Sequence, residues 1–156
     1  MRDRTGLLSL VVGLTTIVVV VAVTSANKQS VVAAETLTIM QDGTYLIYPA
    51  DITRVLDGDT VDLKFRIWVD LVKEARIRLL GIDAPEIRGE EKLRGLITAA
   101  YLKDRITGRR AYLKTDGKSD KYGRLLGIIL VASDDGKTKI DLNKEMLEKE
   151  LVKAYN

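Results

Sequence analysis

The 156-residue sequence predicts a mainly β fold with α elements (α+β): a five-stranded barrel with two helices, preceded by an N-terminal hydrophobic helix. Three observations lead to this prediction. Five short segments have the composition or the apolar–polar alternation of strands, two segments repeat apolar residues every three to four positions, and an uncharged run precedes them all. We expect a membrane anchor or signal peptide at residues 1–26, a linker at 27–43 and the barrel domain at 44–156.

The first element is the segment from Thr5 to Ala26, whose 22 residues carry no charge. A helix of this length reaches about 30 Å, enough to cross the hydrocarbon core of a bilayer. A cleaved signal peptide is the alternative, although the apolar region of such peptides usually runs only about 7–15 residues. Arg2 and Arg4 before the segment, against Lys28 alone behind it, predict a cytoplasmic N-terminus. We therefore expect an extracytoplasmic domain anchored by a single N-terminal helix, or a secreted domain.

The next elements are strands. The segment 61–67 alternates apolar and polar residues as a half-buried strand does, and Asp57-Gly58 before it supplies a turn. Pro85 ends a third strand, because proline has no backbone N–H for the ladder and disfavours helix at the residue before it. The five predicted strands are 45–55, 61–67, 76–82, 111–114 and 125–132.

Two segments have helical periodicity. The first spans residues 91–107 with Gly108 as its C-cap, and the second starts at the cap Asp141 and runs to about Lys153. Their apolar positions are Leu96, Ala99, Leu102 and Ile106, then Leu142, Met146 and Leu151. Three strands, a helix, two strands and a helix suit a closed five-stranded barrel of the oligonucleotide-binding type, the OB-fold.

Two residue types are absent from the chain, cysteine and histidine. Their absence excludes disulfides, thiolate nucleophiles, zinc fingers, Ser-His-Asp triads and histidine-ligated metals. Catalysis must then use carboxylates, lysine, arginine, tyrosine, hydroxyls or a metal held by oxygen atoms. Hard cations such as calcium or magnesium accept a site made of oxygen ligands alone.

The formal net charge of +3 says little about partners, because it falls to +1 once residues 1–34 are set aside. The distribution of charge is more informative. The block from Tyr101 to Arg124 carries eight basic residues against three acidic ones. Such a stripe can neutralise phosphates, although an ordinary solvated charged face is at least as common.

Three clusters carry the residues suited to phosphodiester chemistry, although each alone reads as an ordinary turn or loop. Asp59 and Asp83 stand at strand ends, where two carboxylates can converge on a hard cation. Arg78 and Arg124 can each fork onto phosphate oxygens. Glu86 can order or deprotonate an attacking water. The clusters are Asp-Gly-Asp-Thr at 57–60, Arg-Leu-Leu-Gly-Ile-Asp-Ala-Pro-Glu at 78–86 and Asp-Lys-Tyr-Gly-Arg at 120–124.

In this order and spacing the clusters resemble the staphylococcal nuclease (thermonuclease) family, whose fold is the OB barrel. The likeness covers about residues 52–155 and includes the linking segments 67–68, 91–96 and 142–145. The resemblance implies a calcium ion bound by Asp59, Asp83 and the backbone carbonyl of Ala84, with Asp57 in support. The loop 87–94 is shorter than in the best-known members of the family.

The resemblance also implies roles for the remaining site residues. Arg78 and Arg124 would hold the scissile phosphate, and Glu86 would be the candidate general base. Two further residues, Lys121 and Tyr122, would contact a terminal phosphate of the bound nucleotide. For Tyr155 two interpretations stay open, stacking on a base and packing within the protein.

The function implied is that of a calcium-dependent nuclease acting on DNA and RNA and leaving 3′-phosphate and 5′-hydroxyl ends. We expect a monomer that meets the membrane through residues 5–26 if this segment is uncleaved. One alternative is a noncatalytic OB-fold module that binds nucleic acid and is tethered to a membrane. Another is a cytoplasmic domain that binds a phosphate ligand.

Overall fold

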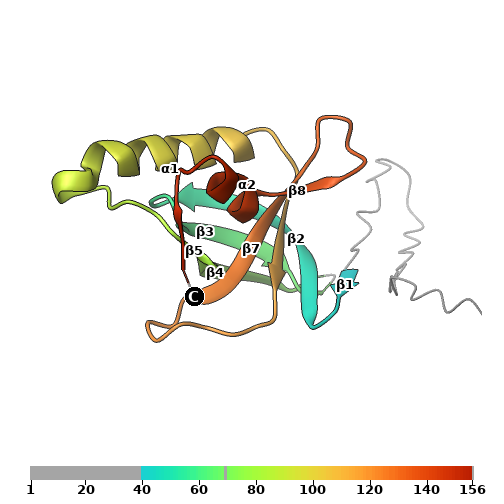
Figure 1. Cartoon of the computed structure of the whole chain (residues 1–156). Coiled ribbons are helices and arrows are strands. Elements are labelled where there is room, and N and C mark those ends of the chain that lie inside the picture. The colour runs from blue at the N-terminus through green and yellow to red at the C-terminus, as the bar shows by residue number, and fades with distance from the viewer. Residues whose placement is uncertain (1–39, 69, 156) are drawn as a thin grey trace, which may run out of the picture.

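The computed structural model describes residues 40–68 and 70–155 (Figure 1). The helices are α1 (Lys92–Ile106) and α2 (Leu142–Glu148), and a 3-10 turn at Gly89–Glu91 leads into α1. The prediction of a mainly β fold with two helices is confirmed. The strands are β1 (Met40–Asp42), β2 (Tyr45–Val55), β3 (Thr60–Arg66), β4 (Val72–Leu79), β5 (Ile82–Asp83), β6 (Ala111–Thr115), β7 (Leu125–Ala132), β8 (Lys139–Asp141) and β9 (Lys153–Ala154).

The five longest strands form a closed ring of backbone pairings. Strand β2 pairs with β3, β3 with β4, β4 with β7, β7 with β6, and β6 again with β2. Ala50 of β2 marks the closure, because it pairs with Phe65 on one edge and with Ala111 on the other. The β4–β7 pairing is parallel and the other four are antiparallel. The short strands β1 and β8 extend β2 and β7.

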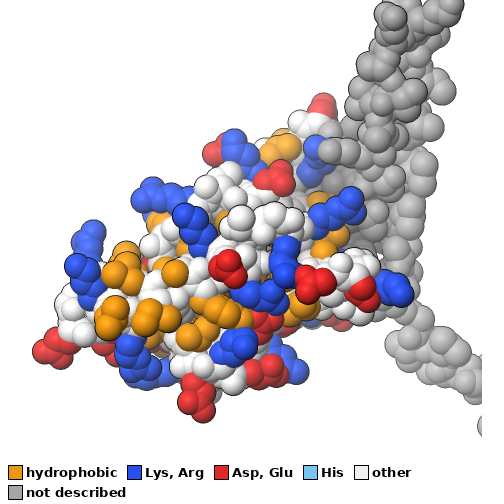
Figure 2. Space-filling view, turned by 90° about the horizontal axis from the view of Figure 1, so that it is seen from above, with side chains coloured by type: hydrophobic (Ala, Val, Ile, Leu, Met, Phe, Trp, Pro, Cys, Tyr) orange, Lys and Arg blue, Asp and Glu red, His pale blue; other side chains and the backbone are white. Residues whose placement is uncertain are grey.

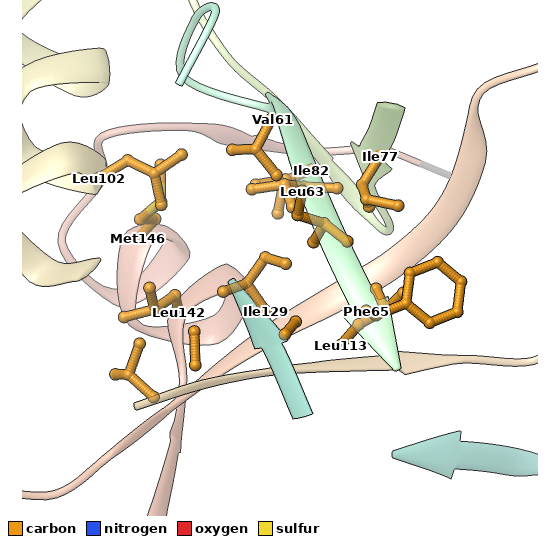
Figure 3. Packing of buried hydrophobic residues seen from close by; sticks show 14 of the residues in the cluster. Val61, Leu63, Phe65, Ile77, Ile82, Leu102, Leu113, Ile129, Leu142 and Met146 are labelled. Carbon is orange, nitrogen blue, oxygen red and sulfur yellow. The ribbon is translucent and has the colours of Figure 1, made fainter. Parts of the chain in front are cut away.

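A single apolar core fills the ring (Figure 3). In β3 the predicted alternation is present: Val61, Leu63 and Phe65 are buried while the residues between them lie at or near the surface. Leu102 of α1 and Met146 of α2 are fully buried in the same cluster. Burying each large apolar side chain contributes about 1.5–3 kcal/mol, so the core holds the strand ends that carry polar residues in fixed positions.

The third predicted strand, 76–82, is wrong at both ends. Strand β4 starts earlier, at Val72, and stops at Leu79. Gly81 adopts a φ of 77°, a left-handed conformation that turns the chain out of the main sheet. The next two residues form β5, which pairs with β9 in a separate two-stranded sheet. Asp83 therefore stands beside the end of β4 instead of continuing it.

Of the apolar positions predicted to face the core, Leu102 and Ile106 of α1 do so, and Leu96 does not. Leu96 is 46% exposed, whereas Gly95, Thr98 and Leu102 are buried. Small residues are favoured on the inner face because the backbone of Glu86 approaches Gly95 closely. In Figure 2, viewed from the side of α1, apolar side chains gather on the surface with basic side chains around them. Gly108 follows the helix with a φ of 72°, as expected of a glycine that ends a helix.

Helix α2 begins as predicted and ends earlier. The Asp141 side chain accepts a hydrogen bond from the Lys144 N–H at 2.9 Å, which caps the first turn. The helix stops at Glu148 instead of near Lys153, because Glu150 has a φ of 56°. The N–H groups of Glu150 and Leu151 donate to carbonyls of the last turn at 3.0 Å each, which closes a Schellman motif.

The structure describes nothing before Met40, so the predicted N-terminal helix lies outside the described residues. Within the part described, no helix is both long and apolar enough to cross a membrane. The last residues of the predicted 27–43 linker form β1, whose Met40 pairs with Ile47 of β2. Strands β8 and β9 are also additional to the predicted five.

Candidate active site

Asp59 lies at the start of β3 and is only 7% exposed. Its position is fixed by a turn in which its N–H donates to Asp57 Oδ1 at 3.0 Å. The carboxylate accepts hydrogen bonds from the Ala84 N–H at 2.7 Å and from the Thr60 hydroxyl at 3.1 Å, and it forms an ion pair with Arg78. Asp59 is therefore a buried carboxylate held in one orientation by groups from two separate segments.

Arg78, near the end of β4, joins the two carboxylates that were predicted as metal ligands. Its Nη2 donates to Asp83 Oδ1 at 2.8 Å, and its Nη1 contacts Asp59 Oδ1. The Nη1 atom is buried and lacks a partner with hydrogen-bond geometry among the residues described. One guanidinium thus brings Asp59 and Asp83 together from strands β3 and β5.

The oxygen atoms at this point fit a hard cation. Asp59 and Asp83 both reach one guanidinium, so their carboxylates are close enough to share a small positive group. The Ala84 N–H donates to Asp59 Oδ2 at 2.7 Å, so the backbone of this residue lies beside the Asp59 carboxylate. Across residues 40–68 and 70–155 no cluster of three or more acidic side chains forms a metal site. Two carboxylates, a carbonyl and water would therefore make up the ligand set.

Arg124 is held by the 120–124 loop. Asp120 Oδ1 accepts the N–H groups of Tyr122 and Arg124 at 2.9 Å each, and Asp120 Oδ2 accepts from Arg124 Nε at 2.7 Å. Gly123 has a φ of 79°, which lets the loop turn back tightly. Asp120 is a positioning residue, a role that the sequence does not reveal because its three bonds form only once the loop closes.

Thr60 links the two arginine sites, and sequence reasoning missed this residue also. Its Oγ1 donates to Asp59 and accepts from Arg124 Nη1 at 3.5 Å. Asp57 lies close enough to interact electrostatically with Arg78 and Arg124, yet burial dominates and raises the pKa of its carboxyl. Both arginines predicted to bind phosphate therefore contact residues at the N-terminal end of β3.

Glu86 is exposed three residues beyond Asp83, and its carboxylate has no hydrogen-bond or ion-pair partner in the described chain. Helix α1 packs against the backbone of Glu86 through Gly95. A Cβ placed on Gly95 would come within 2.6 Å of the carbonyl oxygen of Pro85 and closer still to that of Glu86. The glycine thus allows α1 to pack directly on the segment that carries the carboxylate.

The three predicted substrate-binding residues lie at the surface. Tyr122 is 72% exposed, with Lys121 Nζ 5.0 Å and the Arg124 guanidinium 5.5 Å from its ring centre. Tyr155 is exposed, and its N–H donates to the Gly81 carbonyl at 3.0 Å, beside the turn that delivers Asp83. Tyr155 is therefore not part of the core, while stacking on a base and packing at the chain terminus both stay predictions.

A groove of about 720 Å³ borders the site on the outer face of β3 and β4. Tyr122 and Arg124 form one side of it, and Arg76 forms another. The Arg76 guanidinium donates to both oxygens of Asp62, and this pairing lowers the pKa of the Asp62 carboxyl. The groove offers room for an extended ligand next to Arg124.

The basic block from Tyr101 to Arg124 does not form a continuous unpaired stripe. Five of its eight basic residues, Arg124 among them, form ion pairs with carboxylates, and among the residues described the other three, Lys103, Arg110 and Lys121, form none. The pairs are Arg105–Glu145, Arg109–Asp134, Lys114–Asp42, Lys118–Asp116 and Arg124–Asp120.

The fold and the site define a small, mainly β protein in which carboxylates and arginines converge beside a groove. The family described as staphylococcal nuclease homologue matches residues 76–156, just over half of the sequence, and the chain belongs to this family. A protein of Shigella flexneri named micrococcal nuclease is 29% identical over 127 residues, which cover 80% of this chain and 68% of that protein.

Two further relatives, both named uncharacterized endonuclease, come from Escherichia coli O157:H7 and Escherichia coli. Each is 37% identical over 76 residues, 49% of this chain and 44% of the relative. The chain therefore spans less than half the length of these two proteins. The resemblance found from the three sequence clusters is confirmed at the level of the family.

Proposed function

We propose that this chain is a calcium-dependent nuclease that hydrolyses phosphodiester bonds of DNA and RNA. The observation that carries the proposal is the convergence of Arg78 and Arg124, from separate elements, on Asp59 and Thr60. Two fixed guanidinium groups beside two carboxylates are suited to a phosphate whose charge grows during attack. Family membership and the names of the three relatives support the same activity.

In the proposed mechanism the arginines bind the nonbridging oxygens of the scissile phosphate and stabilise its developing charge. Asp59, Asp83 and the carbonyl of Ala84 would hold calcium, which supplies Lewis-acid polarisation of the phosphate when bound. Glu86 accepts a proton from the water that attacks phosphorus. The bond from phosphorus to the 5′ oxygen breaks opposite that water, and the leaving oxygen takes a proton from solvent, which leaves a 3′-phosphate and a 5′-hydroxyl.

Substrate contacts beyond the scissile phosphate follow from the surface around the site. We assign Lys121 and Tyr122 to a terminal phosphate of the nucleotide and Tyr155 to stacking on a base. Asp57 supports the metal ligands through its hydrogen bond to the Asp59 N–H. We further propose that the ring of five strands is the OB-type barrel on which these contacts are built.

For the location we propose an extracytoplasmic domain anchored by residues 5–26, with a secreted form as the alternative. The uncharged length of this segment and the basic residues before it support the proposal. We expect the domain to act as a monomer.

The test uses the full chain with labelled single-stranded DNA and RNA, in calcium and in excess chelator. Cleavage should require calcium, and end-group analysis should find 3′-phosphates. Glu86→Gln and Arg124→Ala should each lower the rate by about 10²–10³-fold, whereas Arg110→Ala, an exposed arginine at the start of β6, should leave it unchanged. Tight binding without cleavage would instead identify a noncatalytic nucleic-acid-binding module.

A further inference from the structure

The turn between β3 and β4 carries an exposed apolar cluster that the proposed nuclease chemistry does not use. Trp68 and Leu71 are each 54% exposed and Val72 is 50% exposed. Across the turn the Ile67 N–H donates to the Leu71 carbonyl at 2.8 Å. We refer to Trp68, Leu71 and Val72 as the hairpin tip. Three large apolar side chains on one turn are suited to an interface.

The described chain enters the fold next to this tip. Met40 of β1 pairs with Ile47 of β2, and Phe65 of β3 pairs with Ala50 of the same strand. At both Ile47 and Ala50, β6 pairs with the opposite edge of β2. Strands β1 and β3 therefore lie one after the other along the same edge of β2. Ile47 and Ala50 are three positions apart in β2, so their partners Met40 and Phe65 lie about 10 Å apart along that edge.

The chain before Met40 contains the uncharged segment that ends at Ala26. The 13 residues between the two can span at most about 45 Å. A membrane that holds residues 5–26 therefore lies within about 45 Å of Met40, and the hairpin tip is close enough to Met40 to reach the same membrane. Tryptophan is the side chain most typical of the boundary between lipid and water.

We propose that the hairpin tip docks on the surface of the lipid bilayer that anchors the chain; the inference rests on the anchor described under Proposed function. Trp68, Leu71 and Val72 enter the headgroup region and add a second attachment to the anchor. Because Asp70 lies in the same turn, the tip stays at the level of the headgroups and does not enter the hydrocarbon core.

Docking through the tip fixes the orientation of the active site. The β3–β4 ladder runs from the pair Arg66–Val72 beside the tip to the pair Thr60–Arg78 at the site. Six residues of strand separate the two ends, which is about 20 Å. The tip and the site therefore lie at opposite ends of one hairpin, and the docked domain presents its arginines away from the lipid.

The chain contains a single tryptophan, so its fluorescence reports on the tip alone. The full chain is placed in vesicles of phosphatidylcholine and phosphatidylglycerol, with or without bromine on the acyl chains. The wild type should float with the vesicles, and brominated lipid should quench the Trp68 emission. The Leu71→Asp variant should float and cleave a soluble oligonucleotide as the wild type does, but lose the quenching. The control variant Leu96→Asp, which changes an exposed leucine on α1, should retain the quenching of Trp68.

Each other result overturns the docking. If the chain floats with the vesicles but its Trp68 emission is not quenched, the anchor is retained and the contact of the tip with lipid is refuted. A chain that does not float refutes the anchor and the docking together, while the cleavage assay still reports on the nuclease independently. Loss of quenching in Leu96→Asp would assign the lipid contact to α1. A blue-shifted emission without bromine quenching, together with cross-linked dimers, would assign the tip to a second copy of the chain.

Discussion

The close approach of α1 to the segment that carries Glu86 makes Gly95→Ala a sensitive test of the site. The new Cβ would lie 2.6 Å from the Pro85 carbonyl oxygen and closer to that of Glu86, whereas ordinary contacts begin at 3.4 Å, so the segment must move by more than about 0.8 Å. A displacement near 1 Å at a reacting group costs about 10²-fold in rate. Overpacking costs about 1–3 kcal/mol, and the higher helix propensity of alanine offsets about 1 kcal/mol of it. We therefore expect a folded protein whose kcat is about a hundredth of the wild-type value.

The assay compares calcium-dependent cleavage of a fluorogenic single-stranded oligonucleotide with thermal unfolding of the same samples. Leu96→Ala is the matched control, because it changes the next residue of α1 on its exposed face and should leave kcat unaltered. A Gly95→Ala variant that unfolds like the wild type and keeps full kcat would show that the position of Glu86 does not govern the reaction.

Three further changes probe the loop, the helix end and a half-buried ion pair. Asp120→Ala removes the acceptor of two loop N–H groups and of Arg124 Nε, so cleavage should fall by about 10-fold or more. The control Asp116→Ala, also between β6 and β7, should have little effect in the same assay. Glu150→Gly relieves a left-handed residue and should add about 1 kcal/mol, or about 4 °C in Tm by calorimetry. Glu145→Gln should cost about 2 kcal/mol at pH 7 in urea titrations. Because its arginine partner lowers the pKa of Glu145, that stabilisation is present above the usual value of 4.5 and is lost as the pH falls below it, so the two proteins should converge in acid.

The strands of the ring were predictable because each obeys a local rule. Alternation marks β3, and apolar or β-branched composition marks β2, β6 and β7. The ends were less predictable, since they depend on backbone conformations that side-chain periodicity does not encode. Leu151 continues the apolar period of α2, yet a left-handed residue at Glu150 has already ended the helix. Leu96 of α1 was mispredicted for a related reason: the helix contacts Pro85 and Glu86 through Gly95, and Leu96 lies on the exposed side.

The order of the sequence clusters identified the carboxylates and arginines that the structure brings together. It did not identify Thr60, whose hydroxyl gains its role only when the 120–124 loop folds back onto β3. It also overstated the free positive charge between Tyr101 and Arg124, because three of the five acids that pair with this block come from other parts of the chain. Asp42 and Glu145, for example, lie far from Lys114 and Arg105 in sequence.

Strand β9 has a consequence for how the protein loses activity on warming. It consists of two exposed residues and holds β5, with Asp83, only through backbone bonds. Such a short unit opens at a lower free energy than the closed ring, whose strands are paired along both edges. Fraying of β9 would remove the backbone pairing of Asp83 and leave its side chain held by Arg78 while the core stays folded. Amide exchange should therefore be faster in β9 than in β3, and the heat sensitivity of cleavage should follow the fraying of this strand, below the melting temperature of the ring.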